Sequence, residues 1–108
     1  AEAYGIAADV DWDCIQVPLV GDEELSEAVA ADVPSYAALK PIHPSMAGED
    51  FVEFSGCGAR LVFAFIGSNG EPGCADWHSP HFVGVDGAIG TAVDFYVNAS
   101  LRVLAELR

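Results

Sequence analysis

Positively charged residues are scarce in this chain. Four Lys and Arg stand against 17 Asp and Glu, which gives a formal net charge of −13 over 108 residues. Nucleic-acid binding depends on clustered cations that neutralise phosphates. The shortage therefore excludes nucleic acid as a partner and argues equally against an anionic membrane surface. Divalent cations, by contrast, would be attracted to such a field.

Cysteine is also rare, and its pattern bears on the compartment. The three cysteines, Cys14, Cys57 and Cys74, are odd in number, widely spaced and never arranged as CxxC. That pattern argues against a disulfide framework and for a reducing environment. The sequence shows no signal peptide and no apolar run of spanning length. We therefore expect a cytoplasmic protein, and the first residue, Ala1 rather than Met, favours a truncated chain.

Several catalytic signatures are missing. None of the three histidines belongs to an HExxH motif, there is no GxGxxG or Walker-type phosphate loop, and Ser45 and Ser79 lack a nucleophile elbow. A catalytic zinc normally takes three protein ligands and a water. Either the remaining ligands lie on sequence outside this chain, or the chain is not a hydrolase.

Apolar residues, in contrast, are abundant. They make up 52% of the sequence, and the mean hydropathy is +0.31. A chain of this length is one domain at most, with a radius of gyration of about 13 Å if compact. So much apolar material together with so high a net charge indicates that some apolar surface is covered by something absent from the chain.

The hydrophobic pattern predicts an α/β fold with a few strands, about three helices and a long C-terminal helix. Residues 10–17 alternate as a half-buried strand does, and Pro18 ends them. Acids at 22–24 begin a helix of about ten residues that Pro34 stops. Residues 35–44 are expected to form a short strand and a loop.

The second half continues this order. Residues 49–54 are expected to form a short helix that ends at Gly56 or Gly58, and the apolar run 61–66 a strand buried on both faces. A loop at 68–82 then leads to a helix at 86–108. The apolar stripe predicted for that helix consists of Ile89, Val93, Tyr96, Val97, Leu101, Leu104 and Leu107.

Two segments carry the candidate chemistry. His78 and His81 flank Pro80, with Asp76 close by, so one imidazole can bind a metal while the carboxylate orients it. Alternatively, this is a polar loop whose histidines meet solvent. Glu49 and Asp50 are a candidate general base or metal bridge, or simply acids that stabilise the first turn of a helix. The aromatic residues beside the histidines either pack the loop or line a pocket.

Taken together, the segments resemble the C-terminal part of the dinuclear-metal amidohydrolases. That family includes N-acyl-amino-acid amidohydrolases, hippurate hydrolases and indole-acetyl-amino-acid hydrolases, and is related to the zinc carboxypeptidase-like peptidases. The motifs are Met-Ala-Gly-Glu-Asp-Phe at 46–51, an apolar run ending at Gly67, His-Ser-Pro-His-Phe at 78–82, and a long helix from Gly90. The resemblance covers roughly residues 18–108.

The resemblance implies a role for each matching residue. His78 corresponds to a metal ligand, and Glu49 and Asp50 would shape the catalytic site. The residues expected to face substrate are Met46, Gly48, His81 and Phe82. The whole enzyme would use two divalent ions, Zn or Mn, of which this chain alone holds at most one, weakly.

The resemblance also implies an organisation. Residues 1–17 would be the last strand of a lid or dimerisation domain, and residues 18–108 the C-terminal portion of a zinc-peptidase-like catalytic domain. The missing N-terminal half of the same protein would cover the apolar faces, and a homodimer would form through the lid. The substrate would be an N-acyl amino acid or a small peptide, and the isolated segment would be inactive. The other hypothesis is a self-contained acidic binding domain without catalysis.

Overall fold

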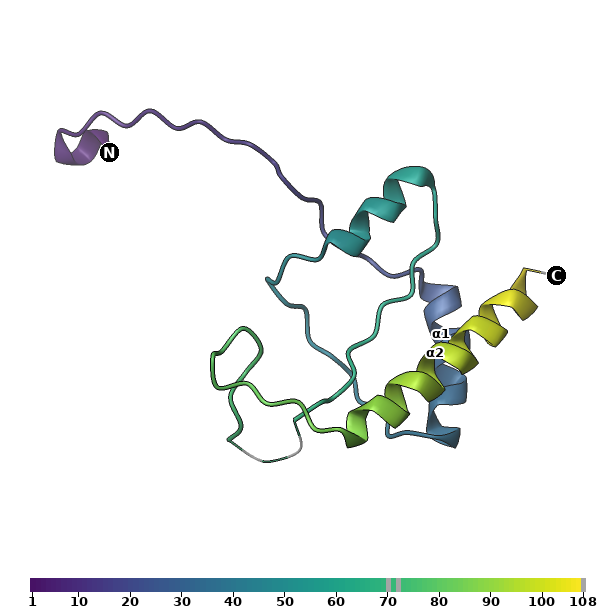
Figure 1. The fold of residues 1–108 in the computed structure, drawn as a ribbon. Coiled ribbons are helices and arrows are strands. Elements are labelled where there is room, and N and C mark those ends of the chain that lie inside the picture. The colour runs from purple at the N-terminus through teal and green to yellow at the C-terminus, as the bar shows by residue number, and fades with distance from the viewer. Residues whose placement is uncertain (70, 72, 108) are drawn as a thin grey trace.

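The computed structural model of this protein describes residues 1–69, 71 and 73–107. Two α-helices and three shorter 3₁₀ helices account for its regular structure (Figure 1). In chain order these are η1 (Glu2–Tyr4), α1 (Glu23–Asp32), η2 (Val33–Ser35), η3 (Asp50–Cys57) and α2 (Gly87–Glu106). The described residues contain no strand, so the predicted α/β fold with a few sheet strands is wrong.

The segments expected to form strands, 10–17 and 61–66, and the segment expected to contain a short strand and a loop, 35–44, have no strand; all are irregular except Ser35, the last residue of η2. An alternation of apolar and polar residues, or an apolar run, indicates side chains that are suited to a sheet. A strand also needs a neighbouring strand with which its backbone forms hydrogen bonds. The backbone of the run 61–66 is joined to a distant segment through Leu61, whose carbonyl accepts from the Asp22 N–H at 2.8 Å. One such bond does not make a ladder. Leu61 is buried, whereas Phe65 remains 45% exposed.

The helices were predicted well because their signals are local. Asp22 caps α1, accepting a hydrogen bond from the Leu25 N–H at 2.9 Å, and Pro34 follows the helix as expected. The helix expected at 49–54 is present as the 3₁₀ helix η3. It ends at Gly58, whose φ of 76° lies in the left-handed region that glycine adopts most readily.

The apolar stripe predicted for α2 is not buried against the rest of the chain, although two of its members, Tyr96 and Leu104, line a groove there. Its members are exposed, for example Tyr96 at 71% and Leu101 at 62%. The half-buried side chains of α2 lie on another face and include Thr91, Ala92, Phe95, Ala99 and Val103. α2 packs against α1, whose buried side chains are Leu25 and Val29. The sequence predicted this helix correctly and its inward face wrongly, because α2 is apolar on both sides.

Two ion pairs connect the ends of α1 to distant parts of the chain. Asp22 at its N-terminus pairs with Arg60, and Asp32 at its C-terminus pairs with Arg102 of α2. A carboxylate at a helix C-terminus opposes the helix dipole. Two hydrogen bonds from the Arg102 guanidinium offset this and hold the pKa of Asp32 below its usual value.

The molecule is extended. Its radius of gyration is 19.0 Å and its principal extents are 61 × 40 × 19 Å. Residues 1–17 run away from the helices, as Figure 1 shows. The accessible surface is 9092 Å², against about 5,700 Å² for a compact monomer of this mass. In the described ranges, no helix is both long and apolar enough to cross a bilayer.

Candidate functional site

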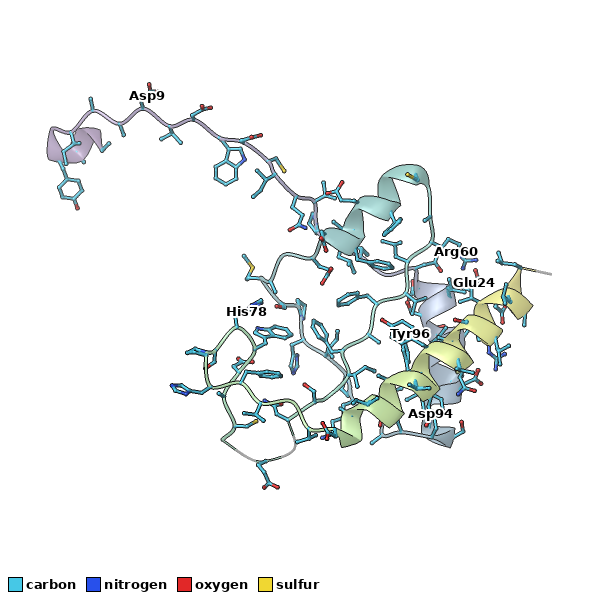
Figure 2. The ribbon with its side chains drawn as sticks, viewed as in Figure 1. Asp9, Glu24, Arg60, His78, Asp94 and Tyr96 are labelled. Atoms are coloured by element: carbon cyan, nitrogen blue, oxygen red, sulfur yellow. The ribbon has the colours of Figure 1, made fainter. Side chains whose placement is uncertain are left out.

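The candidate histidines lie on a loop whose two ends meet. The Val85 N–H donates to the Ser68 carbonyl at 2.6 Å and closes the base of this loop. Nearer the tip, the Asn69 side-chain amide donates to the Ala75 carbonyl at 2.9 Å. These two bonds define the neck of the segment that presents His78, which lies away from the paired helices in Figure 2.

The tip of the loop is a tight turn around His78. The Trp77 N–H donates to the Asp76 carboxylate at 2.8 Å, and the Ser79 N–H donates to the Asp76 carbonyl at 3.2 Å. His78 lies between them with φ of 61° and an exposed side chain. The carboxylate expected to orient the imidazole therefore binds the backbone of Trp77.

His81 and Phe82 complete the turn. The His81 N–H donates to the Ser79 hydroxyl at 3.2 Å, and the Phe82 N–H donates to the Ser79 carbonyl at 3.0 Å. Both side chains are exposed, Phe82 by 38%. The loop thus offers two imidazoles and a phenyl ring to solvent, and their assignment to substrate stays a prediction.

Glu49 and Asp50 lie at the start of η3. The Glu49 carboxylate accepts from the Phe51 N–H at 3.2 Å and so caps this helix. Asp50 follows in the first turn and is exposed. The alternative expectation, acids that stabilise the start of a helix, is therefore observed for Glu49, which does so as the cap. A catalytic role for either acid remains a prediction.

The residues just before these acids also lie in the open. The Met46 side chain is fully exposed. Gly48 lies against Gln16, so that a Cβ at position 48 would come within 2.5 Å of the Gln16 Oε1 atom. The backbone at Gly48 is therefore approached by a side chain of the N-terminal segment, and a substrate role for either residue stays a prediction.

A series of aromatic rings joins the two candidate segments. Ring centroids are separated by 6.1 Å between Phe51 and Phe63, by 5.2 Å between Phe63 and Phe65, and by 4.9 Å between Phe65 and Trp77. Trp77 in turn lies 6.4 Å from the His78 ring. Of the two roles considered for the aromatic residues beside the histidines, packing or lining a pocket, Trp77 shows packing, against Phe65. Phe63 and Phe65, at alternate positions of the run 61–66, were the feature of the sequence from which this series of rings could have been predicted.

The donor set for a metal ion is incomplete in this chain. Within the described residues, no group of three or more His, Cys, Asp or Glu side chains lies close enough together to hold an ion. His78 alone supplies one nitrogen. The residues of this chain do not by themselves fit a two-metal centre, and we derive no chemical step through one.

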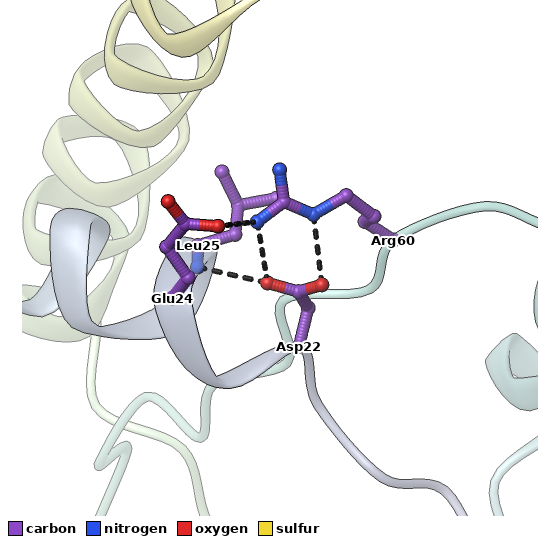
Figure 3. A network of polar contacts seen from close by, with 4 residues as sticks. All are labelled: Asp22, Glu24, Leu25 and Arg60. Carbon is purple, nitrogen blue, oxygen red and sulfur yellow. Dashed lines mark hydrogen bonds and ion pairs between the residues drawn. The ribbon is translucent and has the colours of Figure 1, made fainter.

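A strong polar network lies elsewhere, at the start of α1 (Figure 3). Arg60 donates two hydrogen bonds to the Asp22 carboxylate, both at 2.7 Å, and a third to Glu24 at 3.0 Å. The hydrogen bonds that Asp22 accepts from Arg60 and from the Leu25 N–H lower its pKa to about 2. Asp22 was expected at the start of a helix from the acids at 22–24, whereas no pattern in the sequence pointed to Arg60. Because only four Lys and Arg face 17 Asp and Glu in the sequence, each of the four was a candidate for an ion pair.

An open groove runs beside this network. It has a volume of about 460 Å³ and is lined by Leu25, Arg60 and Val62 and by the α2 residues Phe95, Tyr96, Ala99, Ser100, Val103 and Leu104. Its walls are mostly apolar, and its one cationic side chain is already bonded to two carboxylates. The groove therefore offers apolar contact and no free charge for an anionic ligand.

Comparison with known proteins found one informative relative. The chain is 35% identical over 104 residues to N-acetyl-L-cysteine deacetylase of Bacillus subtilis (strain 168). The match takes in 94% of this chain and 24% of the relative, so the chain spans about a quarter of the length of that protein. No family model and no solved structure matches the chain. The similarity is to one part of an amidohydrolase.

Proposed function

We propose that this chain is part of a metal-dependent amidohydrolase that hydrolyses the amide bond of N-acyl amino acids or small peptides. The observation that carries the proposal is the similarity, along almost the whole chain, to N-acetyl-L-cysteine deacetylase. Removal of an N-acetyl group is the hydrolysis of an amide. The motifs around His78 and Glu49, which resemble those of the amidohydrolases, support the same class.

The exposed apolar surface supports the view that the chain acts as part of a larger unit. Among the residues that the structure describes, five hydrophobic side chains are buried, namely Leu25, Val29, Val33, Val52 and Leu61, while large apolar side chains along α2 and the N-terminal segment are exposed. A self-contained soluble domain rarely exposes so many large apolar side chains while burying so few. This observation counts against the alternative, a self-contained acidic binding domain.

Within the whole enzyme we assign the following roles. His78 ligates one of two divalent ions, Zn or Mn, whose other ligands come from the rest of the protein. Glu49 and Asp50 shape the site, and the substrate contacts are made by Met46, Gly48, His81 and Phe82. The covering partner is the N-terminal half of the same protein, with a homodimer formed through the lid domain. No role is proposed for nucleic acid or membranes.

The test uses the protein expressed from the complete reading frame. Release of acetate from N-acetyl-L-cysteine and of benzoate from N-benzoylglycine is measured for the wild type, for His78→Ala and for a matched control, His43→Ala. We expect His78→Ala to lower kcat/KM by at least a hundredfold and His43→Ala to leave it unchanged. Equal activity of the three proteins would refute the role of His78.

The 108-residue chain on its own provides a second test. We expect no hydrolysis of either substrate by this chain, because one ligand cannot fix a catalytic ion. Hydrolysis by the chain alone, abolished by a chelator, would contradict the proposal that the active unit is larger.

A further inference from the structure

His78 has an unusual backbone conformation. Its φ of 61° makes it the one non-glycine residue of the described chain in the left-handed region. Side chains other than glycine avoid this region for steric reasons, and they persist there only when their surroundings fix them. The neighbours that fix His78 therefore also determine where its imidazole points.

Hydrogen bonds hold the turn only locally. The two bonds to Asp76 join residues within three positions of one another. They set the shape of the turn, and the bonds of Asn69 to Ala75 and of Val85 to Ser68 close the neck of the loop. Contact between the turn and the run 61–66 comes instead from a side chain.

Trp77 is that side chain. Its ring lies 4.9 Å from the ring of Phe65, at an interplanar angle of 39°, and 6.4 Å from the ring of His78. Phe65 belongs to the run 61–66, which no hydrogen bond of the turn reaches. The indole thus links the residue next to His78 to the run 61–66, and both rings of the pair are partly exposed, Trp77 by 43% and Phe65 by 45%.

The same contact connects the two candidate segments. From Phe65 the rings continue through Phe63 to Phe51, which follows directly after Glu49 and Asp50. Aromatic pairs at such separations add to the stability gained by burial alone. A displacement of Trp77 would therefore change the position of His78 relative to the Glu49 segment.

We propose that Trp77, packed against Phe65, is the positioning residue that fixes the imidazole of His78 for its role in the amidohydrolase. The inference rests on the proposed function, since the position of His78 matters only if His78 acts. It assigns no contact with substrate to Trp77.

The test compares Trp77→Ala and Trp77→Phe with a matched control, Trp12→Ala. Trp12 carries the same indole side chain, lies on the N-terminal segment outside the pair with Phe65, and is 85% exposed. Each variant is made in the protein from the complete reading frame and labelled with ¹⁵N-histidine. The His78 signal is assigned by its loss in His78→Asn, and circular dichroism confirms that helix content is retained.

The amide order parameter of His78 gives the answer. We expect about 0.85 in the wild type, in Trp12→Ala and in Trp77→Phe, where a phenyl ring still reaches Phe65, and less than about 0.6 in Trp77→Ala. An unchanged value in Trp77→Ala, with helix content retained, would overturn the proposal. If Trp77→Ala loses its helices, the result for Trp77→Phe is used instead. A low order parameter at His78 in that folded variant would also overturn the proposal.

Kinetics separate this inference from the proposed function. In an active enzyme we expect Trp77→Ala to lower kcat at least tenfold with little change in KM, and Trp77→Phe to restore most of it. An unchanged kcat in Trp77→Ala would overturn the positioning role. An inactive wild type would instead refute the proposed function.

Discussion

At the scale of single residues, Asp22 combines two tasks. Its carboxylate caps α1 and also forms the bidentate pair with Arg60, and both interactions favour the charged form. Because they lower its pKa from 3.8 to about 2, the stability that this group contributes is present above pH 4. It is lost as the pH falls from about 4 through about 2.

Arg60→Gln should raise the pKa of Asp22 toward its unfolded value, since the hydrogen bond from Arg60 is the largest cause of the shift. The matched control is Glu24→Gln, which removes the second acid and leaves the bidentate pair intact. The ¹³C shift of the Asp22 carboxyl, followed between pH 1.5 and 6, measures both. The same midpoint in the two variants would show that Arg60 is not the cause. We expect little effect on global stability, because the pair is partly exposed.

Glu49→Ala should weaken the start of η3, because the Phe51 N–H loses its acceptor. Removal of a helix cap typically costs about 1 kcal/mol. The amide of Phe51 should therefore exchange with solvent about fivefold faster. Glu53→Ala, which removes an exposed carboxylate from the same helix, serves as the control. Equal exchange in the two variants would leave Glu49 without a capping role.

At the scale of elements, the sequence was informative where the cause is local. Asp22 before α1, Pro34 after it and Gly58 after η3 are each decided within a few residues. The strands failed because pairing depends on a neighbour that no local pattern supplies. For the same reason the pairs of Asp22 with Arg60 and of Asp32 with Arg102, 38 and 70 positions apart, could not be predicted.

α2 offers a direct test of which of its two apolar faces is turned inward. Ala99 lines the groove toward α1, whereas Val97 is 53% exposed. Ala99→Glu should reduce helix content, because it places an unpaired charge against apolar side chains. Val97→Glu should leave helix content unchanged. Circular dichroism of the 108-residue chain measures both, and the reverse outcome would restore the apolar stripe predicted from the sequence.

At the scale of the whole molecule, apolar content and compactness do not match. The composition is rich enough in apolar residues for a well-formed core, yet the accessible surface exceeds by more than half the value of about 5,700 Å² that a compact monomer would have. The predicted radius of about 13 Å is likewise smaller than the observed 19.0 Å. The sequence therefore has the apolar residues for a core, but most of the large apolar side chains are exposed rather than buried among the described residues.

This mismatch predicts how the isolated chain behaves in solution. Small-angle scattering at low concentration should give a radius of gyration close to 19 Å, and an extrinsic apolar dye should bind strongly, because α2 and the N-terminal segment expose their apolar side chains. Val97→Glu should reduce the dye signal, and the protein from the complete reading frame should show little of it. A radius near the compact value of about 13 Å, with no dye binding and a cooperative thermal transition, would instead favour the self-contained binding domain. The two hypotheses for this protein therefore differ in a quantity that can be measured before any substrate is known.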